Sequence, residues 1–458
     1  MSDLCLVLQT DPPLAFYRVA RPAGVDLCYP RLIGASSIRT GMRISGGEVG
    51  NCSVALDNGD GSLTGILSDY ALLAPAVLSV DGTEIFSGVV QSVAIGSSAQ
   101  LDLEAKGFTD PLPMRTAAAL GEFQQASVLP IVYGIATVAP VQISSDGRQW
   151  LLADHAIAGV DGVWAGATKL GAWSWRNTLD DSGHTIAMLE TQSAFQQGAL
   201  SVTMRGAMHP ATGALLDTPD AILWHLLTTH GGLTLDAGAL EDLRAWCADT
   251  GVTVGGVLSG SSLTLQSAAD LICEGCGLAW SPLSRGLAQP WPPIEADAIT
   301  TVTRVRSPVL RATADGRNRV THLDVSYDWD DAAGEYRGTM TLAALDVVED
   351  LGREVRQSLS LPWLRSARDV LEHASRRLAW LARITWEITA AQPRGIALEG
   401  DWAQIDHPYS PLSSGIIRDR EISLTGELWT LTGAQGNAPT VTMTASALKD
   451  PIVSAVED

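Results

Sequence analysis

Several residue types are scarce in this chain of 458 residues, and each shortage excludes a class of protein. Lysine occurs only at Lys106, Lys169 and Lys449, and the formal net charge is −21. Because nucleic-acid-binding proteins neutralise phosphates with clustered basic side chains, we expect no stable complex with DNA. Since no apolar run approaches the roughly 18 residues of a membrane span, we also expect no stable membrane insertion.

Charged residues are also few. They make up 18% of the chain, against roughly a quarter in an ordinary soluble domain, while apolar residues make up 46%. Together with 44 glycines, this composition indicates that neighbouring subunits cover much of the surface. A monomer with an adhesive surface is the alternative. The first residues lack the basic stretch that opens a signal peptide, so we expect synthesis and assembly in a cytoplasm.

Cysteine contributes six residues, of which only Cys273 and Cys276 form a CxxC pair. Disulfides are disfavoured in a reducing cytoplasm, and a zinc or iron–sulfur site would need further ligands, for which only Cys247 lies near in sequence. Residues 267–280 have the periodicity of an amphipathic helix. Its predicted apolar stripe consists of Leu271, Ile272, Cys276 and Ala279. We expect buried thiols, and a metal or cluster at Cys273 and Cys276 stays open.

The residues that are present favour β structure, most clearly between 51 and 110. Apolar and polar residues alternate in the runs 53–56, 77–80 and 101–104, as expected of half-buried strands. Turns are predicted at 57–61 and at Asp81-Gly82, because Asn, Asp and Gly tolerate positive φ. This segment therefore predicts a small antiparallel barrel or sandwich, in which no catalytic group is marked out.

The whole chain predicts an α+β fold that is mainly β. We expect an N-terminal β-barrel at 1–118, an inserted β-rich module at 119–215 and an α+β helical buttress at 216–298. A second β-barrel with one long helix at 365–386 would occupy 299–458. The strands predicted within the inserted module are 138–144, 149–152, 162–164, 170–175, 185–189 and 200–204.

Helix signals begin at Thr218, which precedes Pro219 at the first helical position. A second helix is predicted at 239–249, and the long helix carries a continuous apolar stripe. On that stripe, Leu371→Arg or Leu378→Arg is expected to abolish folding or assembly, because a charge would enter the core. The polar tail at 453–458 is expected to fray.

Three patches resemble the baseplate hub (tail hub) proteins of long-tailed bacteriophages, especially Mu-like phages with siphophage tails. The first joins residues 56–61 (LDNGDG) to 85–90 (IFSGVV), the second joins 128–134 (VLPIVYG) to 150–155 (WLLADH), and the third is 398–402 (LEGDW). The resemblance implies that both predicted barrels are hub domains and that the chain is a structural virion protein.

The same resemblance implies a set of partners. Three copies would form a homotrimeric ring at the tail tip or baseplate, presenting six barrels to a six-fold tail tube. The ring would join the distal tail or tail tube protein and the tape-measure protein to central tip or receptor-binding proteins. Genomic DNA would only pass through during ejection. A phage, a tailocin and a gene-transfer particle all remain possible settings.

A search for chemistry assigns no catalytic, cofactor-binding or metal-binding residue. His225 and His230 are five apart, which does not align them on an α-helix face, and no HExxH, GxSxG or phosphate-binding glycine loop occurs. Asp154, His155, Asp181 and His184 could serve a hydrolase only if they converge in one cleft. Asp180 and its neighbours lie beside glycine turns, where such residues are common for backbone reasons.

Fourteen tryptophans stand against five phenylalanines. Trp164, Trp173 and Trp175 cluster in the inserted module and could stack on sugars, or they could serve the core or a subunit interface, where tryptophan is enriched. Three hypotheses therefore remain: a structural hub, a glycan-binding tail module and, less favoured, a cell-wall hydrolase.

Overall fold

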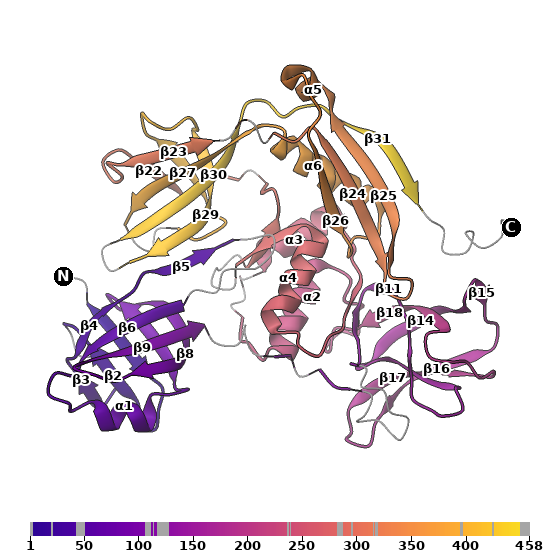
Figure 1. The fold of residues 1–458 in the computed structure, drawn as a ribbon, viewed down its shortest axis with the longest axis horizontal. Coiled ribbons are helices and arrows are strands. Elements are labelled where there is room, and N and C mark those ends of the chain that lie inside the picture. Colours follow the sequence, from indigo (N-terminus) through magenta and orange to yellow (C-terminus); the bar gives the residue numbers. More distant parts are fainter. Residues whose placement is uncertain are drawn as a thin grey trace.

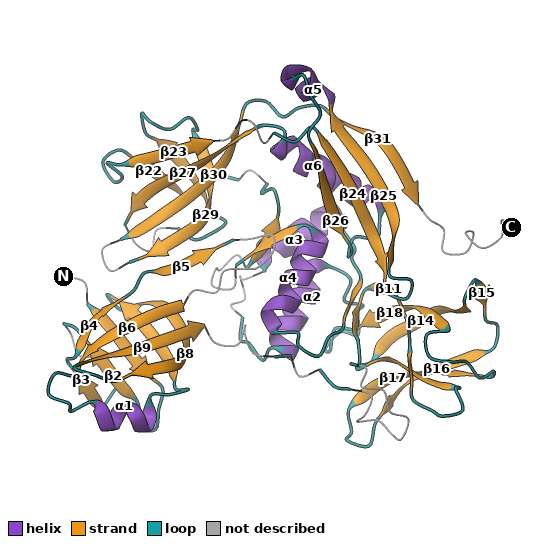
Figure 2. Ribbon diagram, viewed as in Figure 1, coloured by secondary structure: helices purple, strands orange, loops and turns teal. Residues whose placement is uncertain are grey.

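The computed structural model describes residues 3–19, 22–42, 51–105, 111–112, 114–116, 128–235, 238, 240–281, 287–294, 296–314, 316, 319–393, 397–423 and 426–448. Strands dominate this part of the chain, with a few short helices at its centre (Figures 1 and 2), so the prediction of a mainly β α+β fold is confirmed. Lys106, Lys449 and the tail at 453–458 lie outside the described residues.

The N-terminal part is an eight-stranded sheet in the order β3-β2-β1-β7-β8-β9-β6-β4. Its alternating apolar residues form one core with the short helix α1, as the period of two predicted. The strands and the helix are β1 (Leu4–Leu8), β2 (Leu14–Tyr17), β3 (Leu27–Tyr29), β4 (Leu32–Ala35), β6 (Asn51–Asp57), α1 (Thr64–Tyr70), β7 (Pro75–Val80), β8 (Thr83–Ala94) and β9 (Ser98–Ala105).

Both predicted turns of this sheet are present. Asp81 and Gly82 have φ of 52° and 79°, the left-handed conformation that a tight hairpin between β7 and β8 requires. At the other turn, buried Asn58 accepts a hydrogen bond from the Leu63 N–H at 2.9 Å and donates to the Gly96 carbonyl at 2.9 Å. The Asp-Asn-Gly motif therefore has a structural task, because its amide ties the start of α1 to the loop before β9.

The next segment forms a β module that lies at the lower right of Figure 1. Two four-stranded sheets, β11-β18-β14-β15 and β12-β13-β17-β16, enclose an apolar core around buried Trp150. The strands are β10 (Ile131–Tyr133), β11 (Ile135–Val138), β12 (Val141–Gln142), β13 (Gln149–Ala153), β14 (Ile157–Ala165), β15 (Thr168–Lys169), β16 (Trp173–Leu179), β17 (Thr185–Thr191) and β18 (Leu200–Ala207). Strand β10 leaves the module and pairs with β19 of the helical segment.

Two strand predictions in this module were wrong in detail. Residues 138–144 do not form one strand, since Pro140 separates β11 from β12 and these strands belong to different sheets. Residues 170–172 form a turn, and β16 begins only at Trp173.

The central helices pack between the β parts. Helix α4 begins at a capping box, in which Thr264 accepts from the Ser267 N–H at 3.1 Å, and it ends at Gly277 in the left-handed conformation. The elements are α2 (Pro219–His225), η2 (Leu226–His230), α3 (Glu241–Thr250), β19 (Gly256–Leu258), α4 (Leu265–Cys276), β20 (Leu278–Trp280) and β21 (Ala288–Pro290).

The helix predicted at 267–280 therefore has different limits and a different buried face. Because Gly277 ends α4, Ala279 lies in β20, and Leu271 is 47% exposed instead of belonging to the apolar stripe. The start predicted for the helix at 239–249 falls at residue 239, outside the described residues, and α3 begins at Glu241.

The remaining chain forms two sheets. One has the order β22-β28-β29-β30-β27-β23, and the other has the order β26-β24-β25-β31. The elements are β22 (Thr300–Thr303), β23 (Leu310–Ala314), β24 (His322–Asp330), β25 (Glu335–Ala344), α5 (Leu345–Leu351), β26 (Arg356–Leu361), α6 (Ala367–Leu381), β27 (Ile384–Gln392), β28 (Trp402–Asp406), β29 (Ser414–Ile422), β30 (Glu427–Gln435) and β31 (Val441–Leu448).

Helix α6 packs with the central helices and the β24–β26 sheet in one core. It is shorter than the predicted 365–386, because Ile384 begins a β-branched and aromatic strand, β27, that pairs with β30 along its whole length. At its C-terminal end, the side chain of Arg319 donates a hydrogen bond to the Ala382 carbonyl, and that of Arg383 donates to the Ala379 carbonyl. On the apolar stripe, Leu378 is fully buried, as predicted, whereas Leu371 is half-buried.

Strand β5 (Ile38–Gly41) connects two parts that are far apart in sequence. It follows β4 of the N-terminal sheet, yet it pairs antiparallel with β29 of the C-terminal sheet (Figure 1). Ile422, at the end of β29 in the C-terminal sheet, packs into the core of the N-terminal sheet. The two β units therefore share a strand and a core residue, which the alternation pattern could not indicate.

Candidate functional site

The residues proposed for a hydrolase lie where the β module meets the central helices. Arg115 forms ion pairs with both Asp154, at 3.4 Å, and Asp180. His184 reaches the same place, since its Nε2 lies 3.7 Å from Asp154 Oδ1 and 2.9 Å from the Asp154 carbonyl oxygen. Two of the four predicted residues, Asp154 and His184, thus meet, together with Asp180, around an arginine that the sequence did not single out.

Each carboxylate of this group already has structural partners. Asp180 accepts hydrogen bonds from the Ser182 hydroxyl, the Ser182 N–H and the His184 N–H, and these bonds hold its pKa well below the usual value. Burial raises the pKa of Asp154, while the positive charge of Arg115 opposes that rise. Asp180 therefore closes its turn by the backbone role that the glycine-turn pattern predicts.

His155 and Asp181 do not join the cluster. The His155 ring accepts the Val132 N–H at Nε2, 2.9 Å away, so Nδ1 carries the proton and donates to the Ala156 carbonyl at 2.8 Å. Burial lowers the pKa of His155 to about 4. The Asp181 residue is exposed on the turn. The four residues named for a hydrolase are therefore not assembled in one cleft.

His225 and His230 do lie together, contrary to the spacing argument. Their rings are 5.0 Å apart, because residues 226–230 form the single π-helical turn η2, in which residues five apart share a face. The Tyr133 hydroxyl lies 3.0 Å from His225 Nδ1, and burial lowers the pKa of His225 to about 4. His230 Nε2 is buried without a hydrogen-bond partner among the described residues.

The CxxC pair lies inside the central core. Cys273 and Cys276 are fully buried on α4, with Cys247 of α3 also buried nearby, and all are free thiols. Burial raises the pKa of each thiol, which opposes the thiolate form that metal binding and redox chemistry need. Within the described ranges, no group of His, Cys, Asp and Glu is arranged to hold a metal ion.

Trp164, Trp173 and Trp175 of the module are partly buried, and they have different environments. Trp173 and Trp175 lie on one face of β16 and pack against the module core. Trp164, on β14, has the Lys169 ammonium 5.6 Å from its ring centroid. Half-buried packing of this kind supports a core role for Trp173 and Trp175 and leaves no open three-ring platform.

A buried ionic cluster lies where β5 pairs with β29, at the junction of the two β units. Arg420 of β29 donates to both carboxylate oxygens of Glu427, at 3.0 and 2.9 Å, and pairs with Glu399 at 3.5 Å. Thr40 of β5 donates to Glu399, and the Trp429 indole donates to Glu427 at 2.7 Å. Side-chain exposure is 6% for Arg420, 1% for Glu399 and 2% for Glu427.

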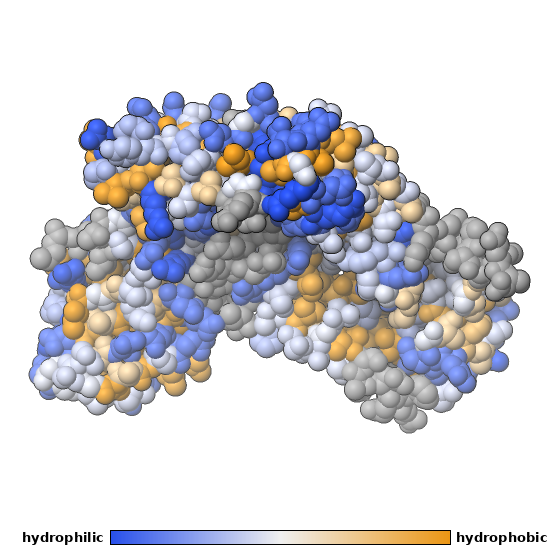
Figure 3. All heavy atoms as spheres, turned by 45° about the horizontal axis from the view of Figure 1, so that its top comes forward, coloured by the Kyte–Doolittle hydropathy of each residue, from blue (hydrophilic) through white to orange (hydrophobic). Residues whose placement is uncertain are grey.

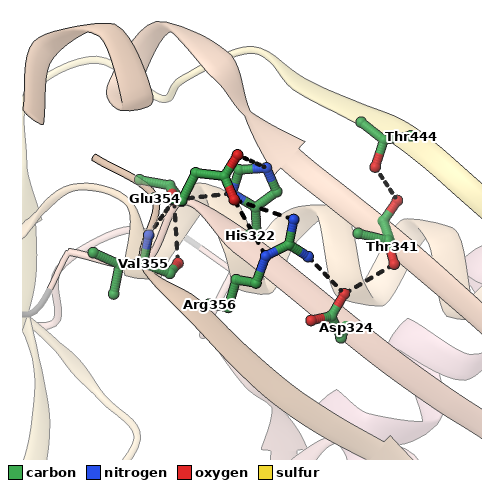
Figure 4. A network of polar contacts seen from close by, with 8 residues as sticks. His322, Asp324, Thr341, Glu354, Val355, Arg356 and Thr444 are labelled. Atoms are coloured by element: carbon green, nitrogen blue, oxygen red, sulfur yellow. Dashed lines mark hydrogen bonds and ion pairs between the residues drawn. The ribbon is translucent and has the colours of Figure 1, made fainter. Parts of the chain in front are cut away.

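A second polar network covers an exposed region of the β26-β24-β25-β31 sheet (Figure 4). Arg356 bridges Glu354, at 3.2 Å, and Asp324, at 3.4 Å, while Thr341 donates to Asp324 at 2.9 Å. His322 Nε2 lies 3.9 Å from Glu354 Oε1. The network joins three strands and the turn before β26, so it stabilises the sheet from its open face.

Apolar side chains also reach the surface. Over the N-terminal sheet, at the lower left of Figure 3, apolar patches interrupt the polar surface. Leu72 and Leu73 are 57% and 66% exposed after α1, and Val305 and Val309 are 92% and 76% exposed beside β22. In the part of the chain with assigned structure, no helix is long and apolar enough to cross a membrane.

Comparison with known proteins identifies no matching family model and no matching curated protein. Similar solved structures include a tail protein from Neisseria meningitidis MC58, 9% identical at a TM-score of 0.44, covering 95% of this chain and 97% of that one. Another is the 43 kDa tail protein of prophage MuSo2 from Shewanella oneidensis, 7% identical at 0.44, covering 94% and 97%. A third is the prophage tail protein gp18 from Listeria monocytogenes EGD-e, 11% identical at 0.42, covering 95% of both chains.

Proposed function

We propose that this protein is the structural hub of a phage-type tail, in which three copies form a ring at the distal end. The observation that carries the proposal is the strand β5, which leaves the N-terminal sheet and completes the C-terminal one through β29. Buried Arg420, Glu399 and Thr40 stabilise that junction. Two β units fixed to each other in this way suit a part that must keep its geometry under load.

The ring geometry follows from having two such units in each chain. Three copies would present six β units, and a six-fold tail tube above could dock on all of them while three-fold parts bind below. The resemblance of residues 56–61, 85–90 and 398–402 to tail hubs supports this arrangement. The first of these patches lies in the N-terminal sheet, and residues 398–402 lie beside and at the start of the strand β28 of the C-terminal one.

Exposed apolar side chains support a role in assembly. Leu72, Leu73, Val305 and Val309 would each cost free energy in water, and burial between subunits would recover about 25 cal/mol per Å² of apolar area. In this proposal, the net charge of −21 repels the DNA that passes through the ring during ejection. The distal tail, tape-measure and tip proteins are its proposed neighbours in the virion, and the chain acts by assembly and not by catalysis.

The test is the mass of the purified protein in solution, measured by light scattering, followed by its copy number in assembled tails. A trimer, or a monomer that enters tails in three copies, is the expected result. The double variant Val305→Asp/Val309→Asp should fold but lose the trimer, whereas Leu179→Asp, at a residue that is also largely exposed (65%) but lies on the β module, should keep it. A hexamer would move the protein into the tail tube, and a monomer that never enters tails would overturn the proposal.

A further inference from the structure

The hairpin between β24 and β25 ends in an irregular tip beside the β module and α4. Asp328 interrupts the pairing, since Tyr327 pairs with Gly338 and Trp329 pairs with Tyr336, and its φ is 57°. A non-glycine residue in this conformation is strained, but the register is the same on both sides of Asp328, so no residue is inserted into the strand. The next pair, Trp329 and Tyr336, has its rings edge to face, with centroids 4.9 Å apart.

Arg365, in the loop before α6, contacts Asp328 and the residue after it. Its Nη1 donates to Asp328 Oδ1 at 2.5 Å and to the Trp329 carbonyl at 2.7 Å. Its Nε and Nη2 are buried without hydrogen-bond partners among the described residues. Buried donors of a charged group are costly when they remain unsatisfied, so this guanidinium is prepared to donate to an oxygen that reaches it.

The carboxyl group of Asp331 supplies a hydrogen-bond acceptor near Arg365. Asp331 follows the tip residue Asp330, which closes the turn: its carboxylate accepts the Ala332 and Ala333 N–H groups, and its carbonyl accepts the Gly334 N–H. Burial raises the pKa of Asp331 to about 6, and the positive charge of Arg365 opposes that rise. The carboxyl group of Asp331 is thus not needed to close the hairpin, although it is held away from bulk water.

These groups surround a hollow of about 250 Å³. Three aromatic residues and three aliphatic ones, among them Val257 and Pro362, form its walls, and one carboxyl and one guanidinium also line it. The lining residues that matter are Trp329, Tyr336, Trp363, Leu271, Asp331 and Arg365. Concave sites with apolar walls and a few convergent polar groups are the usual form of a small-molecule site.

We propose that this hollow binds a saccharide ring, with Trp329 and Tyr336 against its apolar face and Asp331 and Arg365 on its hydroxyl groups. A pyranose combines flat C–H faces with hydroxyl edges, which matches aromatic walls that carry one acceptor and one donor group. The lining carboxylate and guanidinium carry opposite charges, so a neutral ligand fits better than an ion. The site is independent of the hub role, and it lies far in sequence from Trp164, Trp173 and Trp175.

The test uses the full-length protein and methyl glycosides of glucose, galactose, rhamnose and N-acetylglucosamine as probes. Saturation-transfer NMR detects the bound ring protons, and tryptophan fluorescence gives the dissociation constant. Asp331→Asn and Tyr336→Ala should each weaken binding about tenfold or more, a loss of about 1.4 kcal/mol per factor of ten. Trp175→Ala, which removes a half-buried aromatic side chain from the β module, is the matched control and should leave binding unchanged.

Three results would overturn the proposal. The first is no saturable binding of any probe at its solubility limit. The second is binding that survives Asp331→Asn and Tyr336→Ala but is lost in Trp175→Ala. The third is a structure of the assembled particle in which side chains of a neighbouring copy fill the hollow. Thermal melts of the variants, matched to the wild type, show that a lost signal reflects the site and not the fold.

Discussion

Replacing Arg420 tests how the two β units are held together. In the wild type, one guanidinium stands between the carboxylates of Glu399 and Glu427, and all three side chains are at most 6% exposed. Arg420→Ala would remove the cation that pairs with both buried carboxylates. Removing one partner of a buried pair costs about 3–5 kcal/mol, because the remaining charge keeps its desolvation penalty without the attraction that offset it.

Arg418→Ala is the matched control, since Arg418 lies on the same strand. Its side chain is 29% exposed, and its partners are Glu387, 48% exposed at 2.9 Å, and Asp419, 19% exposed at 2.7 Å. Ion pairs of this kind contribute about 0–1 kcal/mol. Urea unfolding followed by hydrogen exchange in β29 and β30, with buried Trp429 as a fluorescence probe, should therefore separate the two variants by about 2–5 kcal/mol.

The deficit of Arg420→Ala should also depend on pH. Burial raises the pKa of Glu399, and the wild-type guanidinium opposes that rise. Without Arg420, the folded-state pKa of Glu399 would rise further above its unfolded value, so the penalty is present above that value and disappears as the carboxylate protonates. The deficit should therefore shrink between pH 7 and about pH 4.5. Equal losses in Arg420→Ala and Arg418→Ala at pH 7 would refute this account of the junction.

Three further outcomes are expected. Leu378→Arg should prevent folding, because a charge would enter the fully buried face of α6; soluble protein with a native melt would contradict this. Gly277→Ala should lower the free energy of unfolding by clearly more than Gly251→Ala. Both glycines cap helices at positive φ, which costs about 1–2 kcal/mol for alanine, but only at Gly277 would the new Cβ overlap the buried imidazole of His373. Since burial lowers the pKa of His155 and His225 to about 4, both stay neutral when folded and bind protons when unfolded. The Tm should therefore fall as pH decreases from about 6.5 to 4, and a flat profile would show that these rings are not the acid-sensitive groups.

Local signals predicted the regular elements well. The Asp81-Gly82 turn is a tight hairpin because both residues adopt positive φ, and alternation located β6, β7 and β9. Helix limits were less accurate, because Gly277 and the strand-forming run from Ile384 stop helices that periodicity alone extends. The strands β23 and β26 and the short helix α5 were not predicted, since each is short and partly exposed.

The candidate sites were harder to predict, because they depend on contacts between distant segments. Asp154 and His184 meet because β13 pairs with β17, and Arg115 pairs with Asp154 and Asp180 at the same place. α-Helical spacing predicted that His225 and His230 would point in different directions, but the π-helical turn places their rings side by side. No sequence signal pointed to the hollow beside Trp329, whose walls come from the β24–β25 hairpin, α4 and the loop before α6.

What the sequence by itself determined is the class of molecule: a mainly β α+β chain, poor in lysine, with turn chemistry at the right hairpins and buried thiols. These properties depend on residues within a few positions of one another, so composition and periodicity report them. Only the tertiary structure decided that β5 crosses to β29, that Arg420 joins Glu399 and Thr40, and that Arg365 faces Asp328. Such pairings set burial and charge through contacts of long sequence separation, and no local pattern encodes which of many compatible partners is chosen.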